Sequence, residues 1–121
     1  MMRLAIPCNE QKLTALLGPQ FGRAAFFAIY DPDSRTVEYI SNSQVVNTPS
    51  GAGVQAARHI IDAGAAALLS AHCGPKAFRA LQAAGIPVYV GLTGTVQEAI
   101  DKYNSGAIQP ATNADVEGHW A

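Results

Sequence analysis

The chain has few of the residues on which disulfide-rich, zinc-binding and nucleic-acid-binding proteins depend. Two cysteines occur in 121 residues, too few for a secreted disulfide scaffold or a four-cysteine zinc site. Charged residues make up only 14% of the chain, and the formal net charge at pH 7 is -1. These values exclude a general nucleic-acid-binding protein that works through a basic surface.

The sequence also lacks a long hydrophobic run. The longest largely apolar stretch, from Ala63 to Ala71, is too short to span a bilayer. The stretch from Met1 to Pro7 is too short for the apolar region of a signal peptide and continues into polar residues. We therefore predict no membrane association and a cytoplasmic location, in which both cysteines are reduced.

What is present is enough for one folded domain. Hydrophobic residues make up 49% of the 121-residue chain, an ordinary share for a globular protein with its own core. Periodic patterns continue to about residue 109, and none is clear from residue 110 onward. We predict a single domain over residues 1–109 and a weakly ordered tail over residues 110–121.

The order of the periodic segments predicts an α/β fold. Alternating or buried-strand patterns are interleaved with segments of helical period, and Gly and Pro punctuate them. The predicted topology is ribonuclease H-like: a five-stranded mixed sheet of order 3-2-1-4-5, with strand two antiparallel, and three helices. The predicted strands are Leu4–Cys8, Ala24–Tyr30, Thr36–Ile40, Ala65–Ala71 and Ile86–Val90, and the helices begin near Val54, Pro75 and Thr95.

This topology brings separate segments to one edge of the sheet. Ligands of open α/β sheets bind beyond the carboxyl ends of the parallel strands. We expect three helix N-termini there, each offering unpaired backbone N–H groups and a partial positive charge to an anion. Lys76, in a first helical turn, and Arg23, before strand two, would add cations. The segments predicted at this edge are 8–9, 47–53, 72–74 and 91–95.

The two cysteines permit different interpretations. Cys8 ends a buried strand, and we interpret it mainly as a packing residue. Cys73 stands between His72 and a Gly-Pro helix start, where a thiolate is favoured, so Cys73 and His72 are candidate metal ligands. Because the predicted topology brings Cys8 and Cys73 close together, a thiol redox pair is an alternative.

Several enzyme classes find no support in the sequence. The predicted edge carries no cluster of acidic residues, which argues against metal-dependent phosphodiester cleavage. The chain has no Gly-x-Ser-x-Gly segment and no Walker phosphate loop. We predict that the protein is not an enzyme.

Five segments of the chain follow one another in a family-specific order. They are Arg3–Pro7, Gln20–Ala24, Gly51–Gly53, Gly74–Phe78 and Gly94–Ala99. In this order they resemble the dinitrogenase iron–molybdenum cofactor biosynthesis family. The resemblance runs from about Arg3 to Gly106 and implies the fold predicted above together with a metal–sulfur cluster that contains molybdenum or iron. Within the family, the chain looks most like a small protein whose molybdenum–copper sulfide cluster is held mainly without covalent protein ligands.

One position departs from the family pattern. Many members carry histidine before the Phe-Gly of the first loop, where this chain has Gln20. Because glutamine is a poor ligand for a soft metal, this departure favours a sulfide-ligated anionic cluster docked by hydrogen bonds, helix dipoles and a cation.

These observations predict a non-catalytic binding or carrier protein for a molybdenum-containing metal–sulfur cluster. The cluster would be a molybdenum–copper sulfide or resemble the iron–molybdenum cofactor, and a protein donor or acceptor would be the partner. The alternatives are the thiol redox protein and a regulatory domain that binds a phosphorylated ligand. The candidate contacts are Gln20, Phe21, Gly22, Arg23, Gly51, Ala52, Gly53, His72, Cys73, Gly74 and Lys76.

Overall fold

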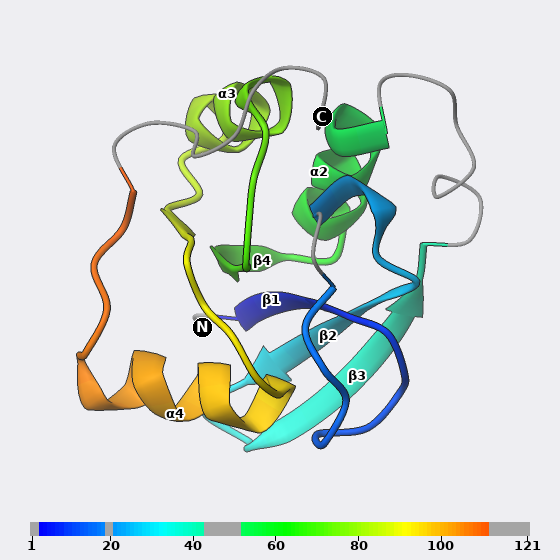
Figure 1. Cartoon of the computed structure of the whole chain (residues 1–121). Helices are drawn as coiled ribbons and strands as arrows, with labels where there is room; N and C mark the ends of the chain where they lie inside the picture. Colours follow the sequence, from blue (N-terminus) through cyan, green and yellow to red (C-terminus); the bar gives the residue numbers. More distant parts are fainter. Residues whose placement is uncertain (1–2, 19–20, 43–51, 112–121) are drawn as a thin grey trace.

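The computed structural model describes residues 3–18, 21–42 and 52–111. Its five strands form one sheet of order β3-β2-β1-β4-β5 (Figure 1). Strand β2 pairs antiparallel with both β1 and β3, whereas β4 pairs parallel with β1 and β5. The predicted strand order and the antiparallel second strand are therefore confirmed. The strands are β1 (Arg3–Cys8), β2 (Phe26–Asp31), β3 (Thr36–Ser41), β4 (Ala65–Leu69) and β5 (Val88–Tyr89).

Three α-helices cover the two faces of the sheet. Helices α2 (Ala52–Asp62) and α3 (Pro75–Ala83) lie on one face, and α4 (Val96–Ser105) lies on the other (Figure 1). A short 3-10 helix, η1 (Phe21–Arg23), precedes β2 and packs against α2. None of the helices in the described ranges is long and apolar enough to cross a membrane.

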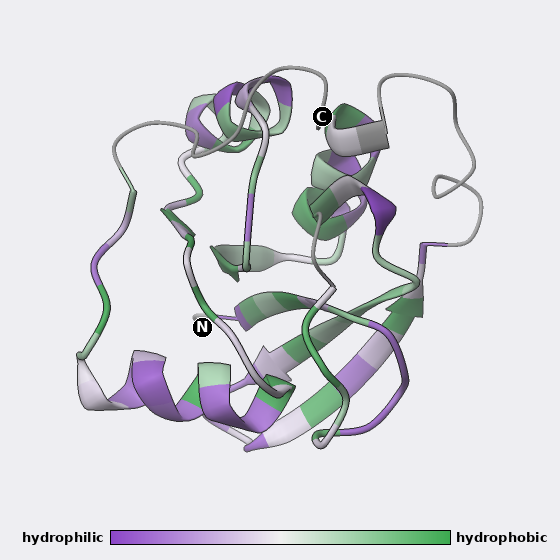
Figure 2. Cartoon of the chain, in the orientation of Figure 1, coloured by the Kyte–Doolittle hydropathy of each residue, from purple (hydrophilic) through white to green (hydrophobic). Residues whose placement is uncertain are grey.

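Alternation along the strands divides the core into two clusters. In β1, Ala5 faces the cluster beneath α2 and α3, while Leu4 and Ile6 face the cluster beneath α4. In β4, Leu68 and Leu69 divide in the same way. Successive side chains of a strand point to opposite faces. Hydrophobic residues accordingly dominate the central strands, whereas hydrophilic residues line the outer surfaces of α3 and α4 (Figure 2).

Strands β4 and β5 are shorter than predicted. Strand β5 contains only Val88 and Tyr89 rather than five residues, because Pro87 has no N–H group to donate; its carbonyl still accepts from the Leu68 N–H at 3.0 Å. Strand β4 ends at Leu69, two residues before the predicted end at Ala71, since Ser70 already belongs to the following loop.

The second strand also starts later than predicted. It begins at Phe26 rather than at Ala24 because the carbonyls of Ala24 and Ala25 accept hydrogen bonds from Asn42 instead of from a strand partner. These hydrogen bonds from Asn42 form part of the candidate site described below.

The end of the described chain lies against the edge strand. The Ala111 N–H donates to the Val88 carbonyl at 2.7 Å, and Ala111 packs against the α2/α3 cluster. The predicted tail, 110–121, therefore begins with two described residues, and residues 112–121 lie outside the described part.

Candidate functional site

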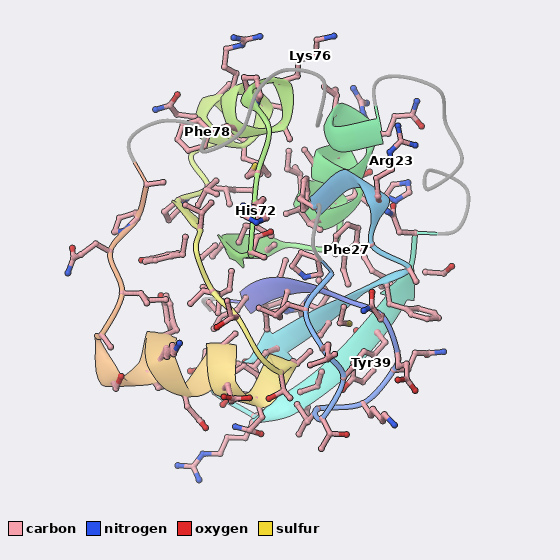
Figure 3. All side chains as sticks on the ribbon, in the orientation of Figure 1. Arg23, Phe27, Tyr39, His72, Lys76 and Phe78 are labelled. Carbon is pink, nitrogen blue, oxygen red and sulfur yellow. The ribbon has the colours of Figure 1, made fainter. Side chains whose placement is uncertain are left out.

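The candidate site lies on the α2/α3 face, at the carboxyl ends of the parallel strands. Strand β3 ends there and leads to Asn42, and β4 ends there and leads through residues 70–74 to α3. Helix α2 begins at this edge and packs against both η1 and α3. In Figure 3, Arg23 lies beside α2, Lys76 projects outward from the start of α3, and His72 lies nearer to the sheet.

Asn42 connects the end of β3 to η1. Its side chain is fully buried, and its Nδ2 donates to the carbonyls of Gly22 at 3.2 Å and Ala24 at 2.9 Å. Its backbone N–H donates to the Ala25 carbonyl at 2.9 Å. Three hydrogen bonds from one residue thus fix the path of the chain through η1.

The side-chain oxygen of Asn42 is an exception to the usual pairing of buried polar atoms. Its Oδ1 is buried, and no hydrogen-bond partner for it exists in the described part of the chain. A buried acceptor of this kind requires a donor, such as an internal water or a proton-bearing group of a ligand. An anion supplies no donor, so Oδ1 is not itself an anion contact.

The three residues of η1 have different roles. Phe21 is 2% exposed and packs against Phe27, with ring centroids 5.3 Å apart. Gly22 is buried, and Arg23 is partly exposed. Phe21 therefore anchors η1 in the core, while Arg23 is the member of η1 that carries a charge at the surface.

The N-terminus of α3 has no side-chain cap. Gly74 occupies the N-cap position in an extended conformation (φ −72°, ψ 166°) without a side-chain hydrogen bond, and Pro75 follows in the first turn. No acidic residue lies in that turn, and Lys76 is exposed. Helix α3 therefore presents backbone N–H groups and a lysine at the same end, an arrangement that favours an anion.

The loop between β4 and α3 is held by the sheet. The buried Ser70 hydroxyl donates to the His72 carbonyl at 2.8 Å, and the Gly91 N–H donates to the Ala71 carbonyl at 2.9 Å. The His72 side chain is partly exposed. It is thus the imidazole that the described part of this edge offers to a ligand.

Cys73 lies inside the core rather than at the surface of the loop. It is 1% exposed, packs in the α2/α3 cluster, and has its Sγ 3.8 Å from the Gly74 carbonyl oxygen. A ligand at the surface therefore does not reach the thiol without a change in packing. Cys73 is therefore a packing residue in the core, which is the role that the sequence predicted for Cys8.

Cys8 is fully buried on the other face, in the α4 cluster. Burial raises the pKa of its thiol to about 11, against smaller opposing effects of hydrogen bonds with the backbone of Ala28 and Glu10. Neither cysteine forms a disulfide bond with a described residue. Cys8 ends β1, whereas Cys73 lies in the loop after β4, and the two pack in core clusters on opposite faces of the sheet, which argues against the alternative of a redox pair.

The N-terminus of α4 does not offer the unpaired N–H groups that the sequence predicted for it. Those of Val96 and Gln97 donate to the carbonyls of Ala15 and Leu13, each at 3.0 Å. Thr95 and Glu98 form a capping box, in which the Glu98 N–H donates to Thr95 Oγ1 at 3.2 Å. With its donors occupied and a carboxylate beside them, this terminus is closed to an anion, so the prediction of three open termini is wrong for α4.

Positive charge gathers around the candidate site. Among the eight lysines and arginines of the chain, Arg23, Arg58, Lys76 and Arg79 lie on η1, α2 and α3, where Asp62 is the acidic residue. No group of three or more His, Cys, Asp or Glu side chains able to hold a metal ion occurs within residues 3–18, 21–42 and 52–111. The arrangement supplies backbone N–H groups and cations rather than a set of metal-ligating side chains.

The structure thus brings most of the described candidates together on one face. Gly22, Arg23, Gly53, His72, Gly74 and Lys76 belong to η1 and to the starts of α2 and α3, while the side chains of Phe21 and Cys73 point into the core. Gln20 and Gly51 lie outside the described residues, as does the side chain of Ala52.

Sequence reasoning missed Asn42 and Ser70, which hold the loops of the site. Asn42 stands two residues after the end of one predicted strand, and Ser70 lies inside another, so no signal in the sequence marked either residue.

The family model for the dinitrogenase iron-molybdenum cofactor matches residues 2–106 of the chain. An uncharacterized protein of Methanocaldococcus jannaschii is 29% identical over 112 residues, which cover 90% of this chain and 91% of that protein. The residues matched by the family model include every described residue of the candidate site.

Two solved structures are similar over almost their whole length. The apo form of the orange protein from Desulfovibrio gigas is 38% identical, with a TM-score of 0.93, and the alignment covers 96% of this chain and 98% of that one. A Thermotoga protein described as a candidate NifB protein is 34% identical, with a TM-score of 0.83 and the same coverage of each chain.

Proposed function

The chain belongs to the dinitrogenase iron-molybdenum cofactor family, and on this premise we propose that it binds or carries an anionic molybdenum-containing metal–sulfur cluster without catalysing a reaction. The family match and the similarity to the orange protein support a cofactor-binding or carrier role. We propose that the cluster docks on the α2/α3 face, against η1 and the starts of α2 and α3.

The observation that carries this proposal is the open N-terminus of α3. It has neither a side-chain cap nor an acidic residue in its first turn, and Lys76 makes no ion pair within the described chain. A lysine is unfavourable at a helix N-terminus because both carry positive charge. A bound anion removes that cost, since it interacts favourably with the lysine and with the helix dipole at once.

The groups that the site offers to a ligand support a cluster that is assembled before it binds. Cys73 is buried in the core, burial keeps the Cys8 thiol protonated, and the described residues offer no group of three or more metal-ligating side chains. Backbone N–H groups and cations instead donate to the outer atoms of an anion. They therefore suit a cluster whose own sulfides complete the coordination of its metals, with His72 as the accessible side-chain ligand.

We propose a molybdenum–copper sulfide cluster as the cargo, with a related iron–molybdenum cluster as the other member of this class. A carrier must receive and release its cargo, so a protein donor or acceptor is the proposed partner, in the cytoplasm. The contacts we propose are residues 20–23, 51–53, 72–74 and Lys76.

Reconstitution with tetrathiomolybdate and copper tests the proposal. The protein should keep a visible charge-transfer spectrum after desalting, and Lys76→Glu should reduce the retained colour through repulsion of the anion. Lys102→Glu is the matched control, because it makes the same charge change on α4, on the other face. A colourless wild-type protein after desalting contradicts the proposal.

The two alternative functions make different predictions. The thiol redox reading requires Cys8, yet that thiol is buried on the face away from Cys73. Wild-type behaviour of Cys8→Ala in a redox-buffer titration would eliminate it. A regulatory domain for phosphorylated ligands shares the anion site, and it is favoured if a phosphorylated compound binds while the thiomolybdate and copper do not.

A further inference from the structure

Strand β3 forms an open edge of the sheet (Figure 1). It pairs with β2 over six residues without a bulge, and no strand within residues 3–18, 21–42 and 52–111 pairs with its other side. At the opposite edge, β5 contains only two residues, and the Ala111 N–H already donates to the Val88 carbonyl. In the described sheet, the outer side of β3 is therefore the long edge to which another strand can add.

The hydrogen bonds between β2 and β3 show which backbone groups of β3 point outward. The Asn42 N–H donates at 2.9 Å to a carbonyl of the chain that enters β2, so Asn42 faces β2. Alternate residues of an antiparallel strand direct their N–H and C=O groups to the same side, so Glu38 and Ile40 also face β2. The N–H and C=O groups of Val37 and Tyr39 therefore point away from β2, toward the open edge.

Strand β3 lacks the features that commonly protect an edge strand. Proteins block such edges with lysine, proline or bulges, and the six residues of β3 include none of these. Val37 and Tyr39 are half-buried and pack at the margin of the α4 cluster, and Figure 3 labels Tyr39 on β3. A strand added at this edge would form backbone hydrogen bonds and cover apolar side chains at the same time.

A second copy of β3 fits this edge. Two copies of one strand, paired antiparallel about a two-fold axis, present the same row of donors and acceptors to each other. A register centred on Glu38 places two carboxylates directly opposite each other, which is destabilising. A register centred on Val37, near the start of β3, overlaps over fewer strand residues. A register centred on Tyr39 keeps the outward-pointing groups opposite each other and places Glu38 opposite Ile40.

We propose that the protein self-associates through β3, which pairs antiparallel with β3 of a second copy so that the two Tyr39 residues lie opposite each other. The two five-stranded sheets then form one continuous sheet of ten strands. Because the pairing is antiparallel, the two candidate cluster sites lie at opposite ends of the paired strands, and each stays open. One short strand per copy makes the contact, so the association should be weak and depend on protein concentration.

Amide hydrogen exchange of the full chain, followed by NMR over a dilution series, tests this pairing residue by residue. Protection of the Val37 and Tyr39 amides should rise with protein concentration, because their N–H groups are bonded only in the dimer. The Glu38 and Ile40 amides face β2 and should be protected at every concentration, so they are internal controls. Sedimentation equilibrium over the same series should show the mean mass rising from that of one chain toward that of two.

Tyr39→Pro and Tyr39→Ala separate the backbone hydrogen bond from the side chain. Both variants lose the phenol ring, but only proline removes the outward N–H, and proline is tolerated in an edge strand at such a position. Tyr39→Pro should raise the dissociation constant of the dimer about tenfold or more relative to Tyr39→Ala, since two symmetric hydrogen bonds are lost. Circular dichroism verifies the fold of each variant.

Each measurement has a result that overturns the proposal. The mass of one chain at every concentration excludes self-association. Association without concentration-dependent protection of Val37 and Tyr39 places the contact elsewhere on the molecule. Equal dissociation constants for the two Tyr39 variants mean that the backbone of β3 does not form the contact. The exchange experiment uses the wild-type chain, so it decides the matter even if Tyr39→Pro does not fold.

Discussion

Asn42 shows how much of the site depends on one side chain. Its Nδ2 group donates to the carbonyls of Gly22 and Ala24, and these bonds hold the 3-10 helix that carries Arg23. The predicted strand ends at Ile40, two residues earlier, and neither periodicity nor a known motif marks Asn42 in the sequence. The residue becomes visible only when the fold brings β3 and η1 together.

We predict that Asn42→Ala lowers the free energy of unfolding by about 1–3 kcal/mol, because it leaves buried carbonyls unpaired. Urea denaturation measures the change. Asn104→Ala, at an exposed position on α4, is the control and should leave stability within about 0.5 kcal/mol of the wild type. An Asn42→Ala midpoint equal to that of the wild type would show that the hydrogen bonds to η1 contribute nothing.

Cys8 should make stability depend on pH in the alkaline range. Burial raises the pKa of its thiol from 9.0 to about 11, so the unfolded state loses this proton at lower pH than the folded state. The stabilisation is fully present below pH 9 and is lost as pH rises to about 11. The loss attributable to Cys8 reaches roughly 2 kcal/mol by the upper end of that window.

Urea denaturation of wild type and Cys8→Ala across this pH window isolates the contribution. The variant starts less stable, because a buried side chain has been shortened, but its stability should fall less steeply with pH. Parallel pH profiles for the two proteins would mean that the thiol has the same pKa in the folded and unfolded states.

At the scale of elements, the N-termini of α3 and α4 form a natural comparison. Helix α4 satisfies its first N–H groups with the capping box and with the carbonyls of Leu13 and Ala15. Helix α3 has no side-chain cap. Thr95 and Glu98 predict the capping box from the sequence, but the contacts from residues 13 and 15 come from a loop whose path no local pattern indicates.

Lys76→Glu should have opposite effects on stability and on binding. A glutamate in the first turn of α3 replaces an unfavourable cation and should stabilise the apoprotein by about 0.3–1 kcal/mol. The same change should weaken retention of the anionic cluster. Thermal unfolding of the apoprotein and colour retention after reconstitution measure the two effects, and a loss in both would indicate that Lys76 has a structural role instead.

Gly94 is required by the capping box of α4. Its φ is +91°, and a Cβ at this position would lie 2.6 Å from Glu98 Oε1. We predict that Gly94→Ala costs more than Gly91→Ala, because Gly91 shares the positive φ (+79°) but has open space around its Cβ position. The positive φ alone costs roughly 1–2 kcal/mol in either variant, and loss of the cap adds about 1 kcal/mol at Gly94.

Chemical denaturation of the two glycine variants gives the difference directly. Equal losses of stability would mean that Glu98 moves aside without cost and that the cap contributes little to α4.

At the scale of the whole molecule, the sequence predicts the strand order because each element carries its own signal. The strands are marked by alternating or continuous apolar residues, a turn is marked at residues 31–34, and a glycine follows each helix. With right-handed crossovers, these elements fit one topology. The site is less predictable, because its residues meet through side-chain packing. The burial of Cys73 and the closure of α4 both depend on contacts between segments distant in sequence.

The two faces of the molecule therefore differ in charge and in helix capping as well as in packing. The α4 face is closed by its own hydrogen bonds, whereas the α2/α3 face combines an uncapped helix with four of the eight lysines and arginines. In a chain with a net charge of -1, this segregation allows an anion to bind without a basic surface elsewhere.

The central claim is that an anionic cluster binds at the α2/α3 edge, and amide chemical shifts of the isotopically labelled protein during a titration with tetrathiomolybdate and copper test it most directly. Binding at this edge should give the largest changes at Arg23, Gly53, Gly74, Lys76 and Ala77, with the amide shifts of residues 96–98 of α4 unchanged. Changes centred on residues 96–98, or none at the start of α3, would contradict it.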